Sequence, residues 1–330
     1  MNVRKLLWQT ARSEHKKALP ILSFPAVQKM NATVGQLVKS SELMTQAMEI
    51  IARETDTLAA VSLMDLSVEA EAFGAQVRFS EHEVPAIVGQ LVSDEDEADA
   101  LAVPALSAGR AAVCVEGVRL AKERITDKPV IAGMIGPYSL AGRLMDVTEI
   151  MYACYDEPET VHTVLDKATQ YLIAYGQALK DAGADAIMMA EPLAGILSPD
   201  MATEFSVPYV KRIIDALQDD EFALIYHNCG NAVSSMLDAI YSQGAAAYHF
   251  GNAVDMADIL CRTPDDILCM GNIDPAGQFA NGTPESIASA TRGLMDKCGR
   301  YGNFVPSSGC DIPAHARWEN IQAFFDTLKA

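Results

Sequence analysis

The sequence predicts an α/β protein, a single (β/α)8 TIM barrel that has an N-terminal helical extension and an insertion after its second strand. Eight short apolar runs recur along the chain without strict alternation, which is typical of strands buried on both faces. Longer amphipathic stretches separate these runs, and such alternation implies a parallel sheet with right-handed crossovers. Eight strand–helix units in 330 residues fit a closed barrel, whose typical size is ~250 residues plus insertions.

The expected strands and helices follow from these runs. Pro199 and Pro284 each stand at a first helical position and mark helix starts. Gly183 and Gly299 mark helix ends. The expected helices include residues 41–54, 159–183, 198–218 and 283–299, and the expected strands are residues 20–24, 58–64, 129–135, 185–190, 222–227, 245–250, 266–271 and 303–307.

The extension and the insertion have their own sequence patterns. Residues 1–17 contain only a short apolar patch before polar residues, so they make a poor signal peptide and are expected to form a helix. Within the insertion, residues 66–127, an extended piece at 75–88 precedes an acidic run at 93–101 that we interpret as the solvated start of a helix. The alternative fold, an open doubly wound sheet, requires a Gly-rich phosphate turn after the first strand, and residues 22–31 contain none.

Composition argues against several classes of partner. The net charge is −19, and a surface that acidic repels phosphate backbones and anionic lipids, so we expect no nucleic acid and no membrane as partner. No apolar run approaches the roughly 20 residues that span a bilayer. The seven cysteines are an odd, scattered set in a chain without an export signal, which indicates reduced thiols and a cytoplasmic location.

The ends of the expected strands carry most of the residues with functional chemistry. In a (β/α)8 barrel, the side chains just past the C-terminal strand ends face one shared mouth. We therefore expect two thiols, imidazoles and carboxylates to converge there. In chain order, the candidates are Asp65, Tyr138, Glu191, His227, Cys229, His249, Asn272 and Cys310.

Three of these residues form a candidate metal site. His227 and Cys229 are two residues apart, so in extended backbone they point the same way. With Cys310 they make a borderline-soft set that suits zinc and leaves a fourth position open, as in catalytic zinc sites. The alternative is the buried end of a strand, and the residues alone leave both interpretations open. A cysteine inside a strand or helix usually packs as a small hydrophobe, so we expect no ligand role for Cys114, Cys154, Cys261, Cys269 and Cys298.

Several linked segments resemble the uroporphyrinogen decarboxylase superfamily. They are residues 62–79, GPYSLAG (136–142), residues 181–213, and the later motifs HNCGN, GNIDP and SSGCDIP. The resemblance covers nearly the whole chain and implies one barrel domain over residues 1–330.

The superfamily contains two chemistries, which this sequence separates in part. Its decarboxylases bind a tetrapyrrole octa-acid without a metal and hold the carboxylates with an arginine-rich N-terminal segment, whereas residues 19–31 here contain no arginine. The other branch consists of zinc-dependent methyltransferases, and its His-x-Cys plus distant Cys signature falls on His227, Cys229 and Cys310. The resemblance to this branch implies transfer of a methyl group to or from a corrinoid. The chain has no Asp-x-His-x-x-Gly segment, so the corrinoid is expected to arrive on a partner protein.

The resemblance leaves the small substrate open between a thiol acceptor and a methyl ether donor, the latter as in O-demethylation. Glu191 is expected either to be a fourth zinc ligand or to orient a neighbour by hydrogen bonds, and we place it with Asp65 as a catalytic candidate. Tyr138, His249 and Asn272 are expected to shape the substrate pocket. The alternatives are a metal-free decarboxylase and a non-catalytic barrel with structural zinc.

Overall fold

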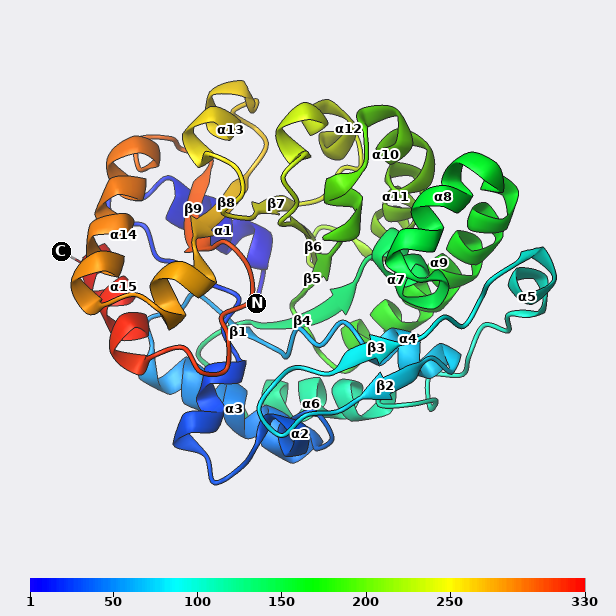
Figure 1. Cartoon of the computed structure of the whole chain (residues 1–330). Coiled ribbons are helices and arrows are strands. Elements are labelled where there is room, and N and C mark those ends of the chain that lie inside the picture. Colours follow the sequence, from blue (N-terminus) through cyan, green and yellow to red (C-terminus); the bar gives the residue numbers. More distant parts are fainter. Residues whose placement is uncertain (330) are drawn as a thin grey trace.

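Seven parallel strands form one curled sheet in the computed structural model, which describes residues 1–329 (Figure 1). Neighbouring strands follow the order β1-β4-β5-β6-β7-β8-β9, and each pair is parallel. Seven of the expected strands are thereby confirmed. Their bounds are Ala60–Val61 (β1), Val130–Ile135 (β4), Ala186–Ala190 (β5), Ala223–Asn228 (β6), Ala247–Phe250 (β7), Cys269–Ile273 (β8) and Phe304–Ser308 (β9).

The eighth position of the barrel is filled by the extended segment that contains Ala18 and Leu19, and the expected strand at residues 20–24 does not form. This segment lies between the two edges of the sheet. The Leu19 amide donates to the Pro306 carbonyl in β9 at 3.1 Å, and the Leu58 amide, just before β1, donates to the Ala18 carbonyl at 2.9 Å. The barrel is therefore closed, but the expectation of a first strand at this place is wrong.

The chemistry of the segment explains why no ladder forms. Pro20 has no amide hydrogen to donate. The next amide, that of Ile21, donates to the Ser308 hydroxyl at 3.0 Å instead of to a backbone carbonyl. A 3₁₀ helix, η1 (Phe24–Lys29), then begins with Pro25 in its first turn. Residues 20–24 therefore form no regular ladder of hydrogen bonds with a neighbouring strand.

The expected helices are confirmed with one correction. The expected stretch 198–218 is two helices, α10 (Pro199–Phe205) and α11 (Val207–Leu217), because Pro208 cannot continue the hydrogen bonding of a helix that precedes it. The other helices are α1 (Val3–Ala11), α2 (Val34–Leu37), α3 (Ser41–Glu54), α4 (Val68–Phe73), α5 (Glu95–Ala100), α6 (Ala111–Arg124), α7 (Pro137–Met145), α8 (Val147–Asp156), α9 (Pro158–Asp181), α12 (Leu237–Tyr241), α13 (Met256–Arg262), α14 (Pro284–Cys298) and α15 (Trp318–Lys329), with the short turns η2 (Leu193–Ile196), η3 (Val233–Ser235) and η4 (Pro275–Ala280).

The insertion after β1 contains the predicted extended piece and acidic helix start. The extended piece is an antiparallel hairpin of β2 (Gln76–Arg78) and β3 (Ala86–Val88), which projects at the edge of the barrel (Figure 1). The acidic run begins α5, where Asp94 caps the helix by accepting the Glu97 amide at 2.9 Å. Acidic side chains in this first turn interact favourably with the helix dipole.

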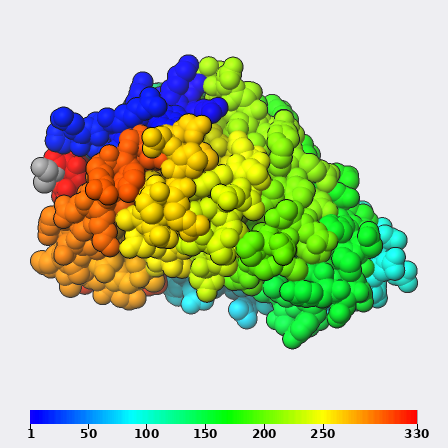
Figure 2. All heavy atoms as spheres, turned by 90° about the horizontal axis from the view of Figure 1, so that it is seen from above, coloured from blue at the N-terminus to red at the C-terminus, as the bar shows by residue number. Residues whose placement is uncertain are grey.

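The N-terminal helix closes one end of the barrel. Val3, Leu7 and Ala11 of α1 belong to the same buried cluster as Met188 and Ile225 from the barrel interior. The N-terminal residues lie as a continuous stretch against later parts of the chain (Figure 2). The opposite end, where the strands terminate, remains as the mouth. None of the helices within residues 1–329 combines the length and the apolar character needed to cross a membrane.

Candidate metal centre at the barrel mouth

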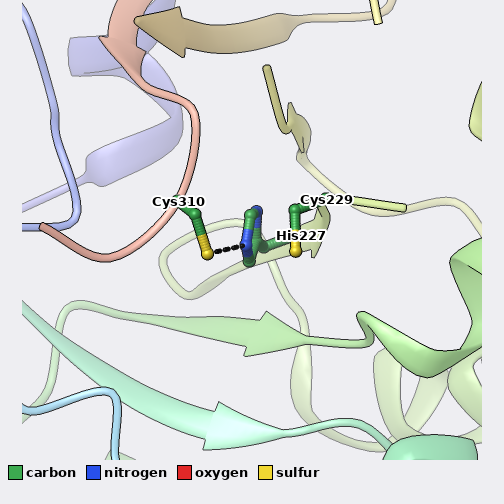
Figure 3. A group of neighbouring side chains, drawn as sticks. All are labelled: His227, Cys229 and Cys310. Carbon is green, nitrogen blue, oxygen red and sulfur yellow. Dashed lines mark hydrogen bonds between the residues drawn. The ribbon is translucent and has the colours of Figure 1, made fainter. Parts of the chain in front are cut away.

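The three residues predicted as metal ligands come together at the mouth. His227 lies at the end of β6, Cys229 follows that strand, and Cys310 follows β9. Their donor atoms all lie within 4.8 Å of one another, and no other such group of three occurs among residues 1–329. The Cys310 Sγ is 3.5 Å from the His227 Nε2, and Figure 3 shows the two thiols on either side of the imidazole.

The local sequence turns the chain so that Cys229 meets His227. The Asn228 Oδ1 accepts the Gly230 amide at 2.9 Å, and the Asn228 Nδ2 donates to the Tyr226 hydroxyl at 2.9 Å. Gly251, after β7, lies against this turn. A Cβ atom on Gly251 would lie 2.5 Å from the Cβ of Cys229, so only glycine permits this approach.

A chain of hydrogen bonds sets the tautomer of His227. The Ser307 hydroxyl donates to the Leu19 carbonyl at 2.7 Å, so it accepts from the Nε2–H of His249, also at 2.7 Å. The Nδ1 of His249 therefore carries a lone pair, which accepts the Nδ1–H of His227 at 2.8 Å. The Nε2 of His227 is left unprotonated and faces Cys310. This is the tautomer that a metal-ligating histidine requires.

His249 occupies a different place from the one predicted. Its side chain is fully buried behind His227, where we expected it to line a substrate pocket. Burial, and then the neighbouring His227, lowers the pKa of His249 well below its ordinary value, so the ring stays neutral. The geometry places His249 where it orients the His227 ring, and it does not favour the substrate contact that we predicted.

The donor set fits zinc. It consists of one imidazole lone pair and two thiol sulfurs, which are the ligand types of catalytic and structural zinc sites. Tetrahedral zinc with ordinary bond lengths places nitrogen and sulfur ligands about 3.5 Å apart, and the Cys310–His227 contact has this length. Without a metal, a hydrogen bond between the two thiols lowers the pKa of Cys229 and raises the pKa of Cys310 to about 12.

The carboxylate of Glu191 is hydrogen-bonded to backbone amides at the start of α7. It follows β5 and is fully buried. Its two carboxylate oxygens accept the amides of Tyr138 at 3.0 Å and Ser139 at 2.5 Å, which are the free amides at the N-terminus of α7. A Cβ on Gly136 would lie 2.5 Å from the Glu191 Oε2, so a glycine is required beside it. Of our two expectations for Glu191, the hydrogen-bonded arrangement is the one that this geometry favours. Its catalytic role stays a prediction.

Asp65 is held in a buried ion pair. One carboxylate oxygen accepts from the amide and hydroxyl of Ser67, at 3.0 and 2.6 Å, and the other pairs with Arg110, which immediately precedes α6. Arg110 also pairs with Glu71 at 2.6 Å. Nothing in the sequence pattern marked Arg110, because it lies at the start of a helix rather than at a strand end. A catalytic role for Asp65 stays a prediction, and these contacts favour a structural one.

Tyr138 points away from the mouth. Its side chain is fully buried, and its hydroxyl lies 3.3 Å from the Met151 sulfur and 3.6 Å from the Cys154 sulfur, both on α8. The tyrosine therefore belongs to the contact between α7 and α8. This placement does not favour the substrate contact that we predicted for its side chain.

Asn272 lies at the mouth, at the edge of a groove of about 580 Å³. Its side-chain amide donates to the carbonyls of Gly251 at 2.9 Å and Val254 at 2.8 Å, which fixes the loop after β7. The groove also contains Asp255 and Lys297. Asn272 is thus placed where the predicted substrate contact requires it, and that contact stays a prediction.

The remaining cysteines lie apart from the cluster of His227, Cys229 and Cys310, and the absence of a ligand role for them stays a prediction. Each belongs to a helix or a strand and none joins the three-residue cluster among residues 1–329: Cys114 (α6), Cys154 (α8), Cys261 (α13), Cys269 (β8) and Cys298 (α14).

Buried polar atoms without hydrogen-bond partners mark three residues that were given no role from the sequence. They are the Oδ1 of Asp311, the Oε2 of Glu69 and the Nε of Arg143. Asp311 follows Cys310 directly, and burial raises its pKa well above the ordinary value. It follows a strand end and is adjacent to a predicted ligand, and these were the two signals available in the sequence. Glu69 and Arg143 both follow strand ends, a weaker signal.

Comparisons with known proteins agree with this architecture. The family model described as uroporphyrinogen decarboxylase (URO-D) matches residues 10–330. The chain is 26% identical over 269 residues to the methylcobamide:CoM methyltransferase of Methanosarcina acetivorans, covering 80% of this chain and 77% of that protein. It is 30% identical over 262 residues to the uroporphyrinogen decarboxylase of Desulfotalea psychrophila, covering 76% and 75%.

The fold is matched over the whole length of a solved structure. A methyltransferase from Methanosarcina mazei superposes with a TM-score of 0.87 at 22% identity, covering 99% of this chain and 98% of that one. The relatives include both methyltransferases and decarboxylases, so the comparisons support an enzyme, and methyl transfer in general terms. With the family match spanning nearly every residue, the chain belongs to the uroporphyrinogen decarboxylase (URO-D) family.

Proposed function

We propose that this protein is a zinc-dependent methyltransferase that moves a methyl group between a corrinoid, carried by a partner protein, and a small substrate. The observation that carries the proposal is the cluster of His227, Cys229 and Cys310. Its imidazole presents a lone pair to the same point as two thiols. The similarity to methylcobamide:CoM methyltransferase supports the reaction class. We also propose a cytoplasmic location, where the thiols stay reduced.

In this proposal, His227, Cys229 and Cys310 would hold zinc, which would lower the pKa of a thiol substrate or polarise the oxygen of a methyl ether. The chain contributes the rest. His249 and Ser307 hold the His227 ring in place. Asn228 and Gly251 hold the turn that carries Cys229. The same ligands serve a thiol acceptor and an ether donor, so the ligands do not distinguish the two directions.

The decarboxylase alternative requires cationic side chains for a substrate with many carboxylates. Residues 19–31 contain no arginine. At the mouth, Arg110 is already paired with Asp65 and Glu71. Arg143 lies beside that network, near Asp65 and Glu69. Among the residues that the structure describes, its guanidinium forms no ion pair. One free guanidinium suits a small anion better than an octa-acid.

The decisive experiment measures the reaction class directly. Purified protein is assayed for methyl transfer from methylcob(III)alamin to a panel of thiols, and from methyl ethers to cob(I)alamin, before and after zinc removal. We expect one of the two reactions, dependent on zinc, and no loss of carboxyl groups from uroporphyrinogen. Decarboxylation of uroporphyrinogen by metal-free protein would contradict the proposal. Full zinc occupancy with no methyl transfer and no binding of thiol or ether would favour the non-catalytic barrel.

A further inference from the structure

Two thiols lie close together at the barrel mouth. Cys229 and Cys310 follow β6 and β9, which are not neighbours in the sheet, yet their sulfurs lie within 4.8 Å of each other (Figure 3). Both residues are half-buried, so a small molecule in solution can reach the pair from the mouth. The same closeness that suits a shared metal also places the two thiols where they can react with each other.

The step from this arrangement to a disulfide is a rotation of one side chain. A disulfide holds its two sulfurs at about 2.0 Å. Cys229 is fixed, because a Cβ atom added to Gly251 would lie 2.5 Å from its own Cβ. Cys310 belongs to no helix or strand. A change of rotamer at Cys310 moves its sulfur while the backbone stays in place, and this is the movement that the disulfide requires.

Other cysteines of the chain are placed differently. Cys154, Cys269 and Cys298 are buried, and a buried structural thiol is unreactive. Cys261 is exposed on α13, but its thiol donates to a carbonyl of its own helix at 3.1 Å. The pair at the mouth combines access from solvent with a second thiol at close range.

We propose that a peroxide oxidises Cys229 and Cys310 to a disulfide, and that this modification removes zinc from the site. One sulfur attacks hydrogen peroxide, breaks its O–O bond and becomes a sulfenic acid, with release of one water. The other thiol then attacks this sulfur, which forms the S–S bond and releases a second water. Two thiols thereby lose two protons and two electrons, and one peroxide is reduced to two waters.

The disulfide is incompatible with zinc binding. The thiolate is the form of cysteine that binds the metal, and neither sulfur of a disulfide has that charge. His227 is then the one ligand left of the three. Its ring stays oriented, because the contacts of His227 with His249 and of His249 with Ser307 involve no sulfur. Reduction by a dithiol therefore restores the site.

The inference rests on the zinc site of the proposed function and adds regulation to that site. Under oxidising conditions the protein would lose zinc and stop transferring methyl groups, and reduction in the presence of zinc would restore both. The disulfide itself requires neither zinc nor methyl transfer, so it can be tested separately.

The first test uses metal-free protein. Equimolar hydrogen peroxide should lower the free thiols of the denatured protein from seven to five. Peptide mass spectrometry should find Cys229 linked to Cys310 with the loss of two hydrogen atoms, and dithiothreitol should reverse the change. In Cys310→Ser the sulfenic acid of Cys229 has no thiol to react with, so dimedone should label Cys229 in this variant far more than in wild type.

The second test uses zinc-loaded protein and a chromophoric chelator. Peroxide should release nearly all of the bound zinc as the disulfide forms. Dithiothreitol followed by added zinc should return the zinc content to its starting value. Cys261→Ser is the matched control, because it removes an exposed thiol outside the pair and should leave the zinc release unchanged.

The outcomes separate this inference from the proposed function. Recovery of Cys229 and Cys310 as sulfinic acids, thiol loss confined to other cysteines, or a disulfide that forms while zinc stays bound would overturn the inference. Disulfide formation with zinc release, in a protein that transfers no methyl group, would keep the inference and reject the reaction. A protein that binds no zinc would reject the proposed function and the zinc release with it, and the disulfide would stand.

Discussion

Two sides of the barrel mouth differ in the kind of chemistry they hold. The metal side consists of His227, Cys229, Cys310, His249 and Ser307, and in the absence of a metal it is built from neutral groups joined by hydrogen bonds. The charged side consists of Asp65, Glu69, Glu71, Arg110 and Arg143, and it is built from the ion pairs of Arg110 beside the unpaired guanidinium of Arg143.

The two sides are prepared to bind different kinds of group. On the metal side, the hydrogen-bond chain runs from His227 to the Leu19 carbonyl, and it leaves one lone pair and two thiols for an ion. On the charged side, Glu69 and Arg143 each keep a buried polar atom without a partner. One side offers clustered donor atoms to an ion, and the other keeps a carboxylate oxygen and a guanidinium nitrogen without partners among the described residues.

The largest effect is expected for Cys310→Ala, which removes a thiol from the metal side. We expect close to one zinc per chain in wild-type protein and most of it lost in the variant, because two ligands bind zinc far less tightly than three. Metal analysis of the purified proteins measures this. Cys269→Ala is the matched control, since Cys269 is buried in β8 outside the cluster. Full zinc content in Cys310→Ala, or metal loss in Cys269→Ala alone, would contradict the ligand assignment.

The next effect concerns the charged side, where Arg110→Met leaves Asp65 and Glu71 without their counter-charge. Breaking a buried pair by removing one partner destabilises a protein by about 3–5 kcal/mol. We expect a loss of this size in urea unfolding, while zinc content stays at the wild-type level. Arg124→Met, which removes an exposed pair with Glu42, should change stability little. Equal stability of the two variants would show that the Arg110 network is not a structural element.

A smaller effect is expected on the metal side for His249→Phe, which removes the acceptor of the His227 Nδ1–H. Residues that orient metal ligands typically change metal affinity by about 10- to 100-fold. We expect a loss in this range, measured by competition with a chelator. His249→Asn places a carbonyl oxygen near the former Nδ1 and should recover part of the affinity. If the phenylalanine variant binds zinc as tightly as wild type, the hydrogen-bond chain has no part in the site.

The sequence predicted that His227, Cys229 and Cys310 would meet at the mouth because each lies at or just after the end of an expected strand. Strands buried on both faces appear as short apolar runs, and the residues that follow such runs reach the mouth. His227, Cys229 and Cys310 were found in this way. The wrong strand at residues 20–24 has a local cause too, since Pro20 cannot donate to a ladder, and the apolar pattern concealed it.

The other roles depend on register and on tertiary contacts, which a single sequence does not contain. His227 and His249 are paired across β6 and β7, and only this register places one ring behind the other. Tyr138 follows a strand end as expected, yet the start of α7 turns its side chain toward α8. Arg110 meets Asp65 through the packing of α6, and no spacing between them in sequence indicates it.

The smallest effect is a dependence of stability on pH that comes from Glu69 on the charged side. Burial raises the pKa of Glu69 from 4.5 to about 7 in the folded protein. Between these two pH values, the folded protein holds a proton that the unfolded chain releases. The resulting stabilisation is fully present below about pH 4.5 and is lost as pH rises through about 7. The direction is opposite to that of a carboxylate in an ion pair.

Glu69→Gln isolates this contribution, because the amide keeps an oxygen for the Ile135 N–H and has no carboxyl proton to lose. The free energies of unfolding of the variant and of wild type are measured with urea at several pH values between 5 and 8. Both proteins carry the same amount of zinc. The effects of zinc release and of other titrating groups then cancel when the two free energies are subtracted. The stability of wild type relative to the variant should fall by about 1–3 kcal/mol with rising pH. A constant difference would mean that Glu69 stays charged in the folded protein. Glu69 would then be a counter-ion of Arg143, and the charged side would hold no guanidinium without a counter-charge.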